Sequence, residues 1–154
     1  MTMTLLPPQT VAPARALPLR QGLYALGALN LAIGLYGVLS PHGFYKNVLG
    51  VDLLGPYNQH FMSDIGGFYL GFAVAFLLAA RSLSPDLIRG ICAGYAVTQL
   101  LHFLYHITHL GRFSTGEAIA QTIGLAIILA APVICTMLTA RLDAGSAPRA
   151  RRRP

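Results

Sequence analysis

The chain has 154 residues, of which 55% are hydrophobic and 10% are charged, and its mean hydropathy is +0.59. Soluble globular domains carry about 25% charged residues, so this composition excludes a water-soluble domain and indicates an integral membrane protein. The net charge of +6 could suggest a nucleic-acid partner, but the arginines lie at the ends of apolar segments. We therefore expect the lipid bilayer, and no nucleic acid, as a partner.

Four apolar segments are long enough to cross a bilayer as helices. At about 1.5 Å per residue, roughly 20 apolar residues cover the hydrocarbon core. We expect these spans at about 22–39, 61–80, 87–110 and 116–139. Short connections between consecutive spans favour antiparallel neighbours. The predicted fold is all-α: a polytopic membrane protein with a four-transmembrane-helix up-down-up-down bundle over residues 20–140.

The basic residues predict how the bundle is oriented. All but two of the eleven lie in the terminal segments or beside the loop between the second and third spans, and the two exceptions are Lys46 and Arg112. The positive-inside rule therefore predicts a bacterial inner-membrane protein with both termini in the cytoplasm. Residues 1–19 are expected to form a flexible cytoplasmic tail, and residues 141–154 a basic, disordered one that contacts anionic lipid.

The longest connection, residues 41–60, has a mixed character. It is semi-apolar, but Gly50, Gly55 and Pro56 interrupt it, and it is too short to span the bilayer. We expect it to form an interfacial helix or a cap over the mouth of the bundle.

An unusual stripe of polar residues marks the third span. At about 100° per residue, the stripe covers a face roughly 80° wide on a helix, and the rest of that helix is apolar. Its members are Tyr95, Gln99, His102, His106 and His109. Because ionisable residues inside a membrane are costly, they usually face the bundle interior and a partner.

The other spans place polar residues in the same outer half of the bilayer. His60 and Asp64 lie on the second span, Glu117 and Gln121 on the fourth, and Asn30 on the first. We therefore predict a polar chamber that is open, or nearly open, toward the outer side. The tentative metal- or ligand-binding residues are His60, Asp64, His102, His106, His109 and Glu117, and the chamber lining adds Asn30, Tyr95, Gln99 and Gln121.

Small residues and helix-start signals complete the predicted bundle. Glycines four residues apart let helices approach closely, and two such pairs are predicted to pack helices: Gly67 with Gly71, and Gly90 with Gly94. Exposed faces of this kind would leave room for a homo-oligomer or other membrane subunits. Ser114 or Thr115 is expected to cap the fourth span, with Glu117 in its first turn, where the helix dipole favours a carboxylate.

Three interpretations of the chamber remain open from the residues alone. The first is a redox site that holds haem or a transition metal (Zn, Cu or Fe), since His102 and His106, like His60 and Asp64, are spaced to reach one ion. The second is a metal-free pocket for a quinone, an isoprenoid or a lipid, where a carboxylate beside a histidine moves protons.

In the third interpretation, the polar residues bond one another and hold the bundle together. The protein would then be an accessory or scaffold subunit of a larger membrane complex. We favour this third interpretation, with a chamber that can still hold a cofactor or an apolar ligand. Whether the protein is an enzyme stays open.

Two stretches, Asn58–Ala80 and His102–Leu110, resemble small bacterial four-helix membrane proteins of the DoxX-like kind. The shared pattern is an acidic residue followed by glycine-rich apolar sequence, and then HxxxHxxH near the end of the third span. The resemblance implies a four-helix fold, with His60, Asp64 and the three histidines in one site. Some DoxX-like proteins are linked to quinone or thiol redox chemistry. Cys92 and Cys135 form no CxxC pattern, so we expect both to be small buried apolar residues without a thiol role.

Overall fold

The computed structural model describes residues 16–146, and every regular element in that range is a helix. Four of the helices are long and apolar enough to cross a membrane: α1 (Leu17–Leu39), α3 (Gln59–Ser82), α4 (Pro85–Ile107) and α5 (Thr115–Ser146). The short helix α2 (Pro41–Asn47) and the 3-10 turn η1 (Leu110–Arg112) lie in connections. The predicted all-α, four-helix membrane fold is confirmed.

Two helices extend beyond their predicted ends. α1 begins at Leu17, so residues 17–19 are helical rather than part of a flexible tail. α5 runs to Ser146, so the predicted disordered tail is helical at its start. Packing accounts for both extensions, because Leu19 is buried in the core and Asp143 forms an ion pair with Arg89 of α4. The remaining parts of the two predicted tails lie outside the described residues.

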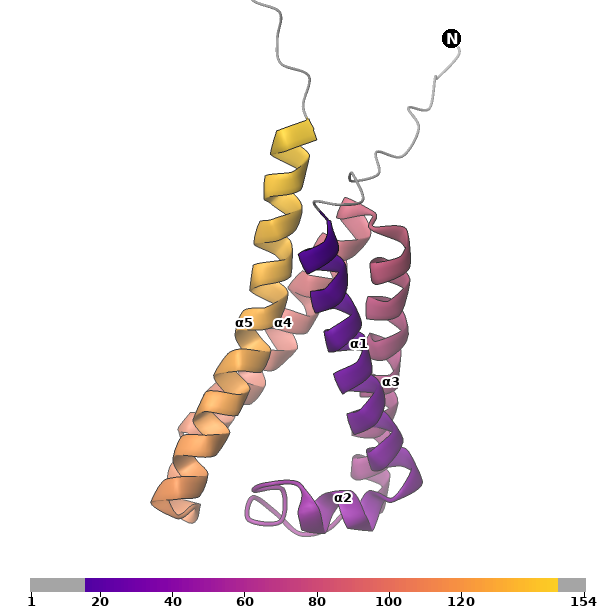
Figure 1. The fold of residues 1–154 in the computed structure, drawn as a ribbon. Coiled ribbons are helices and arrows are strands. Elements are labelled where there is room, and N and C mark those ends of the chain that lie inside the picture. The colour runs from indigo at the N-terminus through magenta and orange to yellow at the C-terminus, as the bar shows by residue number, and fades with distance from the viewer. Residues whose placement is uncertain (1–15, 147–154) are drawn as a thin grey trace, which may run out of the picture.

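The four long helices form two antiparallel pairs (Figure 1). α1 packs along α3 and α4 packs along α5, whereas the contacts between the two pairs are few. The pairs converge at the end of the bundle that holds the start of α1 and the end of α5, and they diverge toward the opposite end (Figure 1). We call these the terminal end and the open end.

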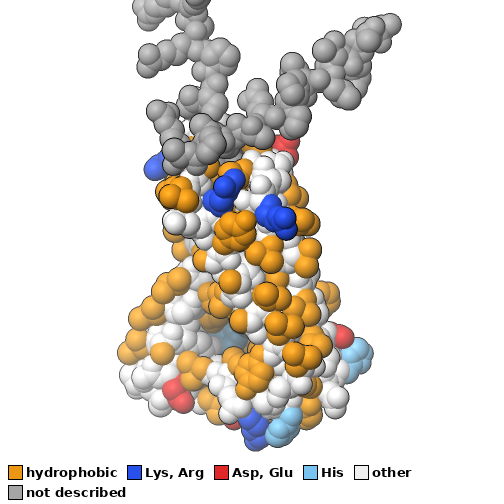
Figure 2. Space-filling view, turned by 45° about the vertical axis from the view of Figure 1, so that its right-hand side comes forward, with side chains coloured by type: hydrophobic (Ala, Val, Ile, Leu, Met, Phe, Trp, Pro, Cys, Tyr) orange, Lys and Arg blue, Asp and Glu red, His pale blue; other side chains and the backbone are white. Residues whose placement is uncertain are grey.

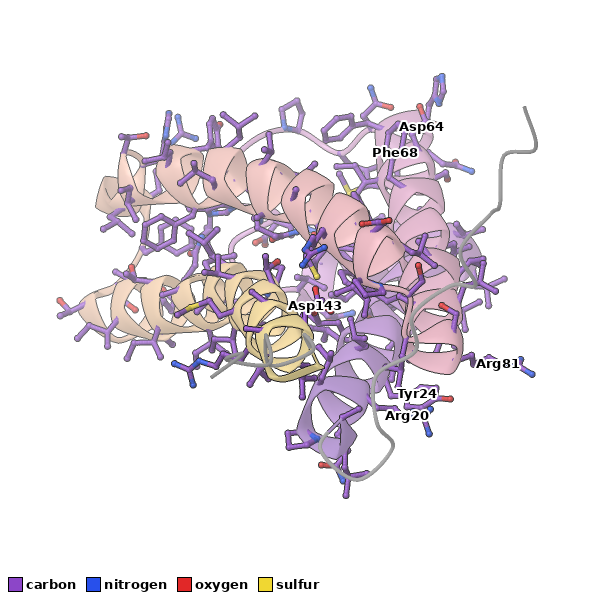
Figure 3. The ribbon with its side chains drawn as sticks, turned by 90° about the horizontal axis from the view of Figure 1, so that it is seen from above. Arg20, Tyr24, Asp64, Phe68, Arg81 and Asp143 are labelled. Atoms are coloured by element: carbon purple, nitrogen blue, oxygen red, sulfur yellow. The ribbon has the colours of Figure 1, made fainter. Side chains whose placement is uncertain are left out.

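The hydrophobic core lies at the terminal end, where both pairs meet. Its buried members include Leu23 of α1, Phe76 of α3, Ile88 of α4 and the two free cysteines, Cys92 and Cys135. The cysteines are buried among apolar side chains, as predicted. Basic side chains lie near this end (Figure 2), and Figure 3, seen from above, shows the arginines of α1 and α3 on the outside of the bundle.

Close packing of α1 against α3 depends on glycines that face each other. A Cβ atom added to Gly34 would lie 2.8 Å from the backbone nitrogen of Leu70. One added to Gly66 would lie 2.9 Å from the backbone nitrogen of Val38. Both distances are too short for any real Cβ atom, so the two backbones touch only because these side chains are absent.

The four glycines predicted to pack helices do not do so within this chain. Gly67, Gly71, Gly90 and Gly94 are all exposed, and a Cβ atom on any of them would meet nothing within 4 Å. The prediction is wrong for packing within this chain, because the face of α3 that meets α1 carries Gly66 instead. The four glycines point away from the neighbouring helices.

Candidate functional site

The diverging helix pairs enclose a cavity of about 630 Å³ at the open end. The space-filling view shows the hollow between the two pairs, with a histidine side chain visible inside it (Figure 2). Residues of α1, α3, α4 and α5 form its walls. α2 and the segment that follows it, residues 48–57, lie across the open end (Figure 1). The predicted cap over the mouth of the bundle is therefore confirmed.

Most of the cavity wall is apolar. The apolar part includes Ile33 of α1, Met62 and Ile65 of α3, and Leu125 and Ile128 of α5. No Asp, Glu, Lys or Arg lies among the described residues that line the cavity. The interior therefore offers apolar surface and neutral polar groups.

The polar part of the wall is the stripe on α4. Gln99, His102 and His106 all line the cavity, as predicted. The two imidazole rings meet edge to face, with centroids 4.4 Å apart. Tyr69 of α3 also lines the cavity. His102 has a large accessible area because its ring borders this hollow.

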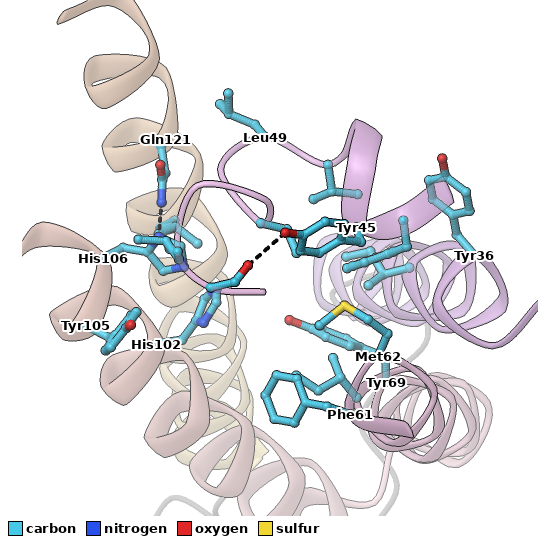
Figure 4. A pocket seen from close by; sticks show the side chains of 18 of the residues that line it. Tyr36, Tyr45, Leu49, Phe61, Met62, Tyr69, His102, Tyr105, His106 and Gln121 are labelled. Atoms are coloured by element: carbon cyan, nitrogen blue, oxygen red, sulfur yellow. Dashed lines mark hydrogen bonds between the residues drawn. The ribbon is translucent and has the colours of Figure 1, made fainter. Parts of the chain in front are cut away.

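A hydrogen bond between helices fixes the orientation of His106. The side-chain amide nitrogen of Gln121, on α5, donates to Nδ1 of His106 (Figure 4). With the amide nitrogen of Gln121 as the donor, Nδ1 of His106 is the acceptor, and this arrangement corresponds to the tautomer whose proton lies on Nε2. Both side chains are largely buried, with exposed fractions of 7% for Gln121 and 8% for His106. The Oε1 atom of Gln121 is buried without a partner among the described residues.

Three contacts hold the cap in place. The hydroxyl of Tyr45 donates to the carbonyl of Gly55 at 2.8 Å, which closes the segment on itself (Figure 4). The guanidinium of Arg112 donates to the carbonyl of Leu53 at 3.0 Å, which joins the cap to the connection between α4 and α5. Gly50 has a φ of +82° and lies so close to the ring of Phe113 that any side chain there would overlap the ring.

His60 and Asp64 do not belong to the cavity. They form an ion pair with each other at 3.0 Å, and their side chains are 85% and 52% exposed. Figure 3 shows Asp64 on the outer side of the bundle. Their assignment to the chamber is wrong because they lie on the face of α3 opposite the one that carries Met62, Ile65 and Tyr69.

His109 and Glu117 also lie outside the cavity lining. The ring of His109 stacks on Tyr105 at 4.2 Å, and its Nδ1 donates to the Tyr105 carbonyl at 2.7 Å. Glu117 accepts hydrogen bonds from the backbone nitrogen and the hydroxyl of Ser114, at 2.9 and 2.7 Å. This reciprocal arrangement is a capping box, so the predicted cap is Ser114. Glu117 stabilises the start of α5 instead of lining the chamber.

Asn30 and Tyr95 are core residues rather than lining residues. Both are completely buried, and neither lines the cavity. The amide nitrogen of Asn30 donates to the backbone carbonyl of Leu26 at 2.8 Å and to the Tyr95 hydroxyl at 3.1 Å. Of the four lining residues predicted, the cavity includes Gln99 and Gln121.

The described residues form no cluster of three or more donors that could hold a metal ion. All five histidines lie in the described range, and no three His, Cys, Asp or Glu side chains there come close enough to hold a metal. His102 and His106 share one helix, while His60 faces away on another. No pair of helices therefore presents imidazoles to each other across the cavity.

The contribution of α3 to the cavity wall was not among the predictions. Met62, Ile65 and Tyr69 recur at spacings of three and four, which is the signal of one helix face. This spacing can be seen in the sequence. The predicted site, however, was placed on the opposite face of α3, which carries His60 and Asp64. His60 and Asp64 lie on the exposed face of α3, and not on the face that lines the cavity.

No protein-family model, curated protein or solved structure matches this chain. The DoxX-like resemblance therefore stays a prediction.

Proposed function

We propose that this protein is a multi-pass membrane protein that holds a small molecule with an apolar body in the cavity at its open end. The cavity itself carries the proposal. Pockets for small molecules usually measure about 300–1,000 Å³ and are mostly apolar, with a few polar groups that fix the ligand's orientation. A volume of about 630 Å³, an apolar wall and one polar stripe match that description.

We propose binding and not acid–base catalysis, because the carboxylates that such catalysis needs do not line the cavity. Acid–base chemistry in the cavity required Asp64 or Glu117 beside a lining histidine, but Asp64 pairs with His60 outside the cavity and Glu117 bonds Ser114. Entry from the bilayer is supported by the few contacts between α3 and α4, which form neighbouring walls of the cavity. An apolar molecule would pass between them from the lipid.

The proposal includes an orientation in a bacterial inner membrane, with the terminal end toward the cytoplasm and the cavity in the outer half. Arg20, Arg81 and Arg89 belong to the terminal end, whereas Lys46 lies in the last turn of the open-end helix α2. Lys46 is the one lysine of the chain. A membrane-impermeant amine reagent added to intact cells should modify Lys46. If Lys46 reacts only after the cells are opened, the orientation is reversed.

Photo-labelling in nanodiscs tests the binding function. A long-chain alkane that carries a diazirine should label cavity residues such as Met62 and Leu125 more strongly than lipid-facing residues. Ile65→Trp should block this labelling by filling the cavity. Phe68→Trp is the matched control, because Phe68 lies on the same helix and is 72% exposed. Labelling that is uniform over the lipid-facing surface, or unchanged by Ile65→Trp, would refute the proposal.

An accessory or scaffold role is a second proposal, favoured by the exposed glycine pairs of α3 and α4. Since no neighbouring helix within residues 16–146 comes within 4 Å of a Cβ atom placed on them, they leave flat faces against which another helix could pack. Gly71→Leu and Gly94→Leu should then reduce the mass of the complex extracted in mild detergent, without unfolding the chain. An unchanged mass for both variants would exclude an assembly through these faces.

A further inference from the structure

We infer that the cavity selects a neutral ligand whose head group carries an oxygen acceptor, and that Gln121 is the positioning residue that makes His106 the donor to it. This inference rests on the proposed binding function and names the chemistry of its ligand. It is carried by the contact between Gln121 and His106 and by the composition of the cavity wall.

The cavity wall disfavours a charged ligand. No charged side chain lines it among the described residues. Lys46, Asp52 and Asp64 each adjoin a lining residue in sequence, but all three are exposed and none of them lines the cavity. An ion moved from water into such a site would lose its hydration without gaining a counter-ion, and this is strongly unfavourable. The ligand that fits is therefore neutral.

His106 supplies a hydrogen-bond donor. Its Nδ1 accepts from the amide of Gln121, so the proton lies on Nε2, for which no hydrogen bond is found among the described residues. His106 lines the cavity, and Figure 4 shows Gln121 reaching it from the neighbouring helix. A bare N–H at an apolar cavity calls for an acceptor, and a neutral ligand provides one as a carbonyl or ether oxygen.

Packing alone does not account for a glutamine at position 121. The side chain is 7% exposed, and its Oε1 atom is buried without a partner among the described residues. An unpaired buried oxygen costs free energy that a leucine at the same position would avoid. What the glutamine provides is the hydrogen bond to Nδ1, which holds the ring and its tautomer as a buried polar network does.

The head group then lies against the two imidazoles, and the body lies against α1 and α3. His102 packs edge-on against His106 and makes no hydrogen bond among the described residues, so it borders the same head group. Ile33 and Met62 belong to the apolar remainder of the wall. The ligand class is a long neutral amphiphile with an oxygen acceptor at one end.

A chain-matched series of compounds tests the inference in nanodiscs. A methyl ketone, an alkane, a carboxylic acid and a primary amine of equal chain length compete with the diazirine alkane for the cavity. The ketone should bind about tenfold tighter than the alkane, the effect of one well-placed hydrogen bond. The acid and the amine, charged at neutral pH, should bind no better than the alkane.

Variants of Gln121 separate positioning from simple packing. Gln121→Leu should bring the ratio of ketone affinity to alkane affinity down to about one, because the tautomer of His106 is then no longer held. Gln121→Glu should also abolish the preference for the ketone, because a carboxylate accepts a hydrogen bond from Nδ1–H and so favours the tautomer that leaves Nε2 without a proton. ¹⁵N NMR of labelled histidine should show the proton on Nε2 in the natural chain and on Nδ1 in Gln121→Glu. Thr122→Val is the control, since Thr122 bonds its own helix at the Ala118 carbonyl.

The possible outcomes distinguish the two proposals. If no compound displaces the probe and the cavity is not labelled, the binding function fails. If ketone and alkane bind equally, or if the acid or the amine binds best, the binding function stands and the present inference is overturned. An Nδ1–H tautomer in the natural chain would also overturn it.

Discussion

The buried amide of Asn30 on α1 donates a hydrogen bond to the buried hydroxyl of Tyr95 on α4, at 3.1 Å. This contact joins the two helix pairs, whose mutual contacts are otherwise few. Phe72 and Phe76 of α3 pack edge-on against the Tyr95 ring, with centroid distances of 4.9 and 5.1 Å. Tyr95 therefore contacts both members of the α1–α3 pair.

Tyr95→Phe should weaken the attachment of the two pairs. Hydrogen bonds between membrane helices contribute about 0.6 kcal/mol on average, so the loss of the hydroxyl should lower stability by about that amount. The thermal unfolding midpoint in one detergent measures the effect. Tyr24→Phe is the control, because Tyr24 is exposed on α1. Equal midpoints for Tyr95→Phe and the natural chain would show that the aromatic packing alone joins the pairs.

Gly66→Ala should disrupt the contact between α1 and α3. The added methyl would lie 2.9 Å from the backbone nitrogen of Val38, and a backbone atom cannot move aside as a flexible side chain can. Overpacking of this kind costs about 1–3 kcal/mol.

The neighbouring glycine offers a matched control for that substitution. Gly67→Ala places the same methyl group in open space, and alanine is about 1 kcal/mol more favourable than glycine in a helix. Unfolding in mixed micelles should therefore rank Gly67→Ala at or above the natural chain and Gly66→Ala below it. The opposite order would mean that Gly67, not Gly66, faces α1.

The rotation of α3 about its own axis shows how much of the site could be predicted from the sequence alone. Length and hydropathy were sufficient to locate four spans, because membrane helices follow directly from those properties. They could not determine which face of a helix points inward. At about 100° per residue, His60 and Asp64 lie roughly half a turn from Met62, Ile65 and Tyr69. In a water-soluble protein the charged face of a helix points outward, and in this protein the face with His60 and Asp64 is also the exposed one.

The stripe on α4 was predicted correctly as a face but not as a single environment. Tyr95 and His106 lie on the same side of the helix, yet the first is enclosed in the core and the second borders the cavity. The difference arises because the helix pairs converge at one end and diverge at the other (Figure 1). Periodicity along one helix carries no information about the angle between helices, so depth within the bundle was not predictable from it.

Ser114→Ala should destabilise the start of α5 without affecting the cavity. It removes the hydroxyl that bonds Glu117, and loss of a capping serine typically costs about 1 kcal/mol. Amide hydrogen exchange over the first turn of α5 should accelerate. Thr115→Ala, one residue further on, removes a hydroxyl from an exposed position and should leave exchange nearly unchanged. If Ser114→Ala prevents labelling of the cavity as well, then Glu117 has a role in the site beyond capping.

Arg112→Gln should release the cap from the helix pair on the other side of the cavity. The hydrogen bond from Arg112 to the Leu53 carbonyl joins segments that are 59 positions apart in the chain, and an amide side chain is too short to replace it. A hydrogen bond to a charged donor contributes about 1.5 kcal/mol or more when it is well ordered, which corresponds to roughly tenfold faster opening.

Hydrogen exchange of the amides in residues 48–57 measures that opening directly and does not require a ligand. Lys46→Gln is the control. Lys46 lies on the same side of the molecule, and its substitution removes one charge without affecting the hydrogen bond to Leu53. Faster exchange in Arg112→Gln alone would identify the Arg112 contact as the attachment point of the cap. Equal exchange in both variants would assign that role to the contact between Gly50 and Phe113, where the backbone of the cap lies against the ring with no room for a side chain.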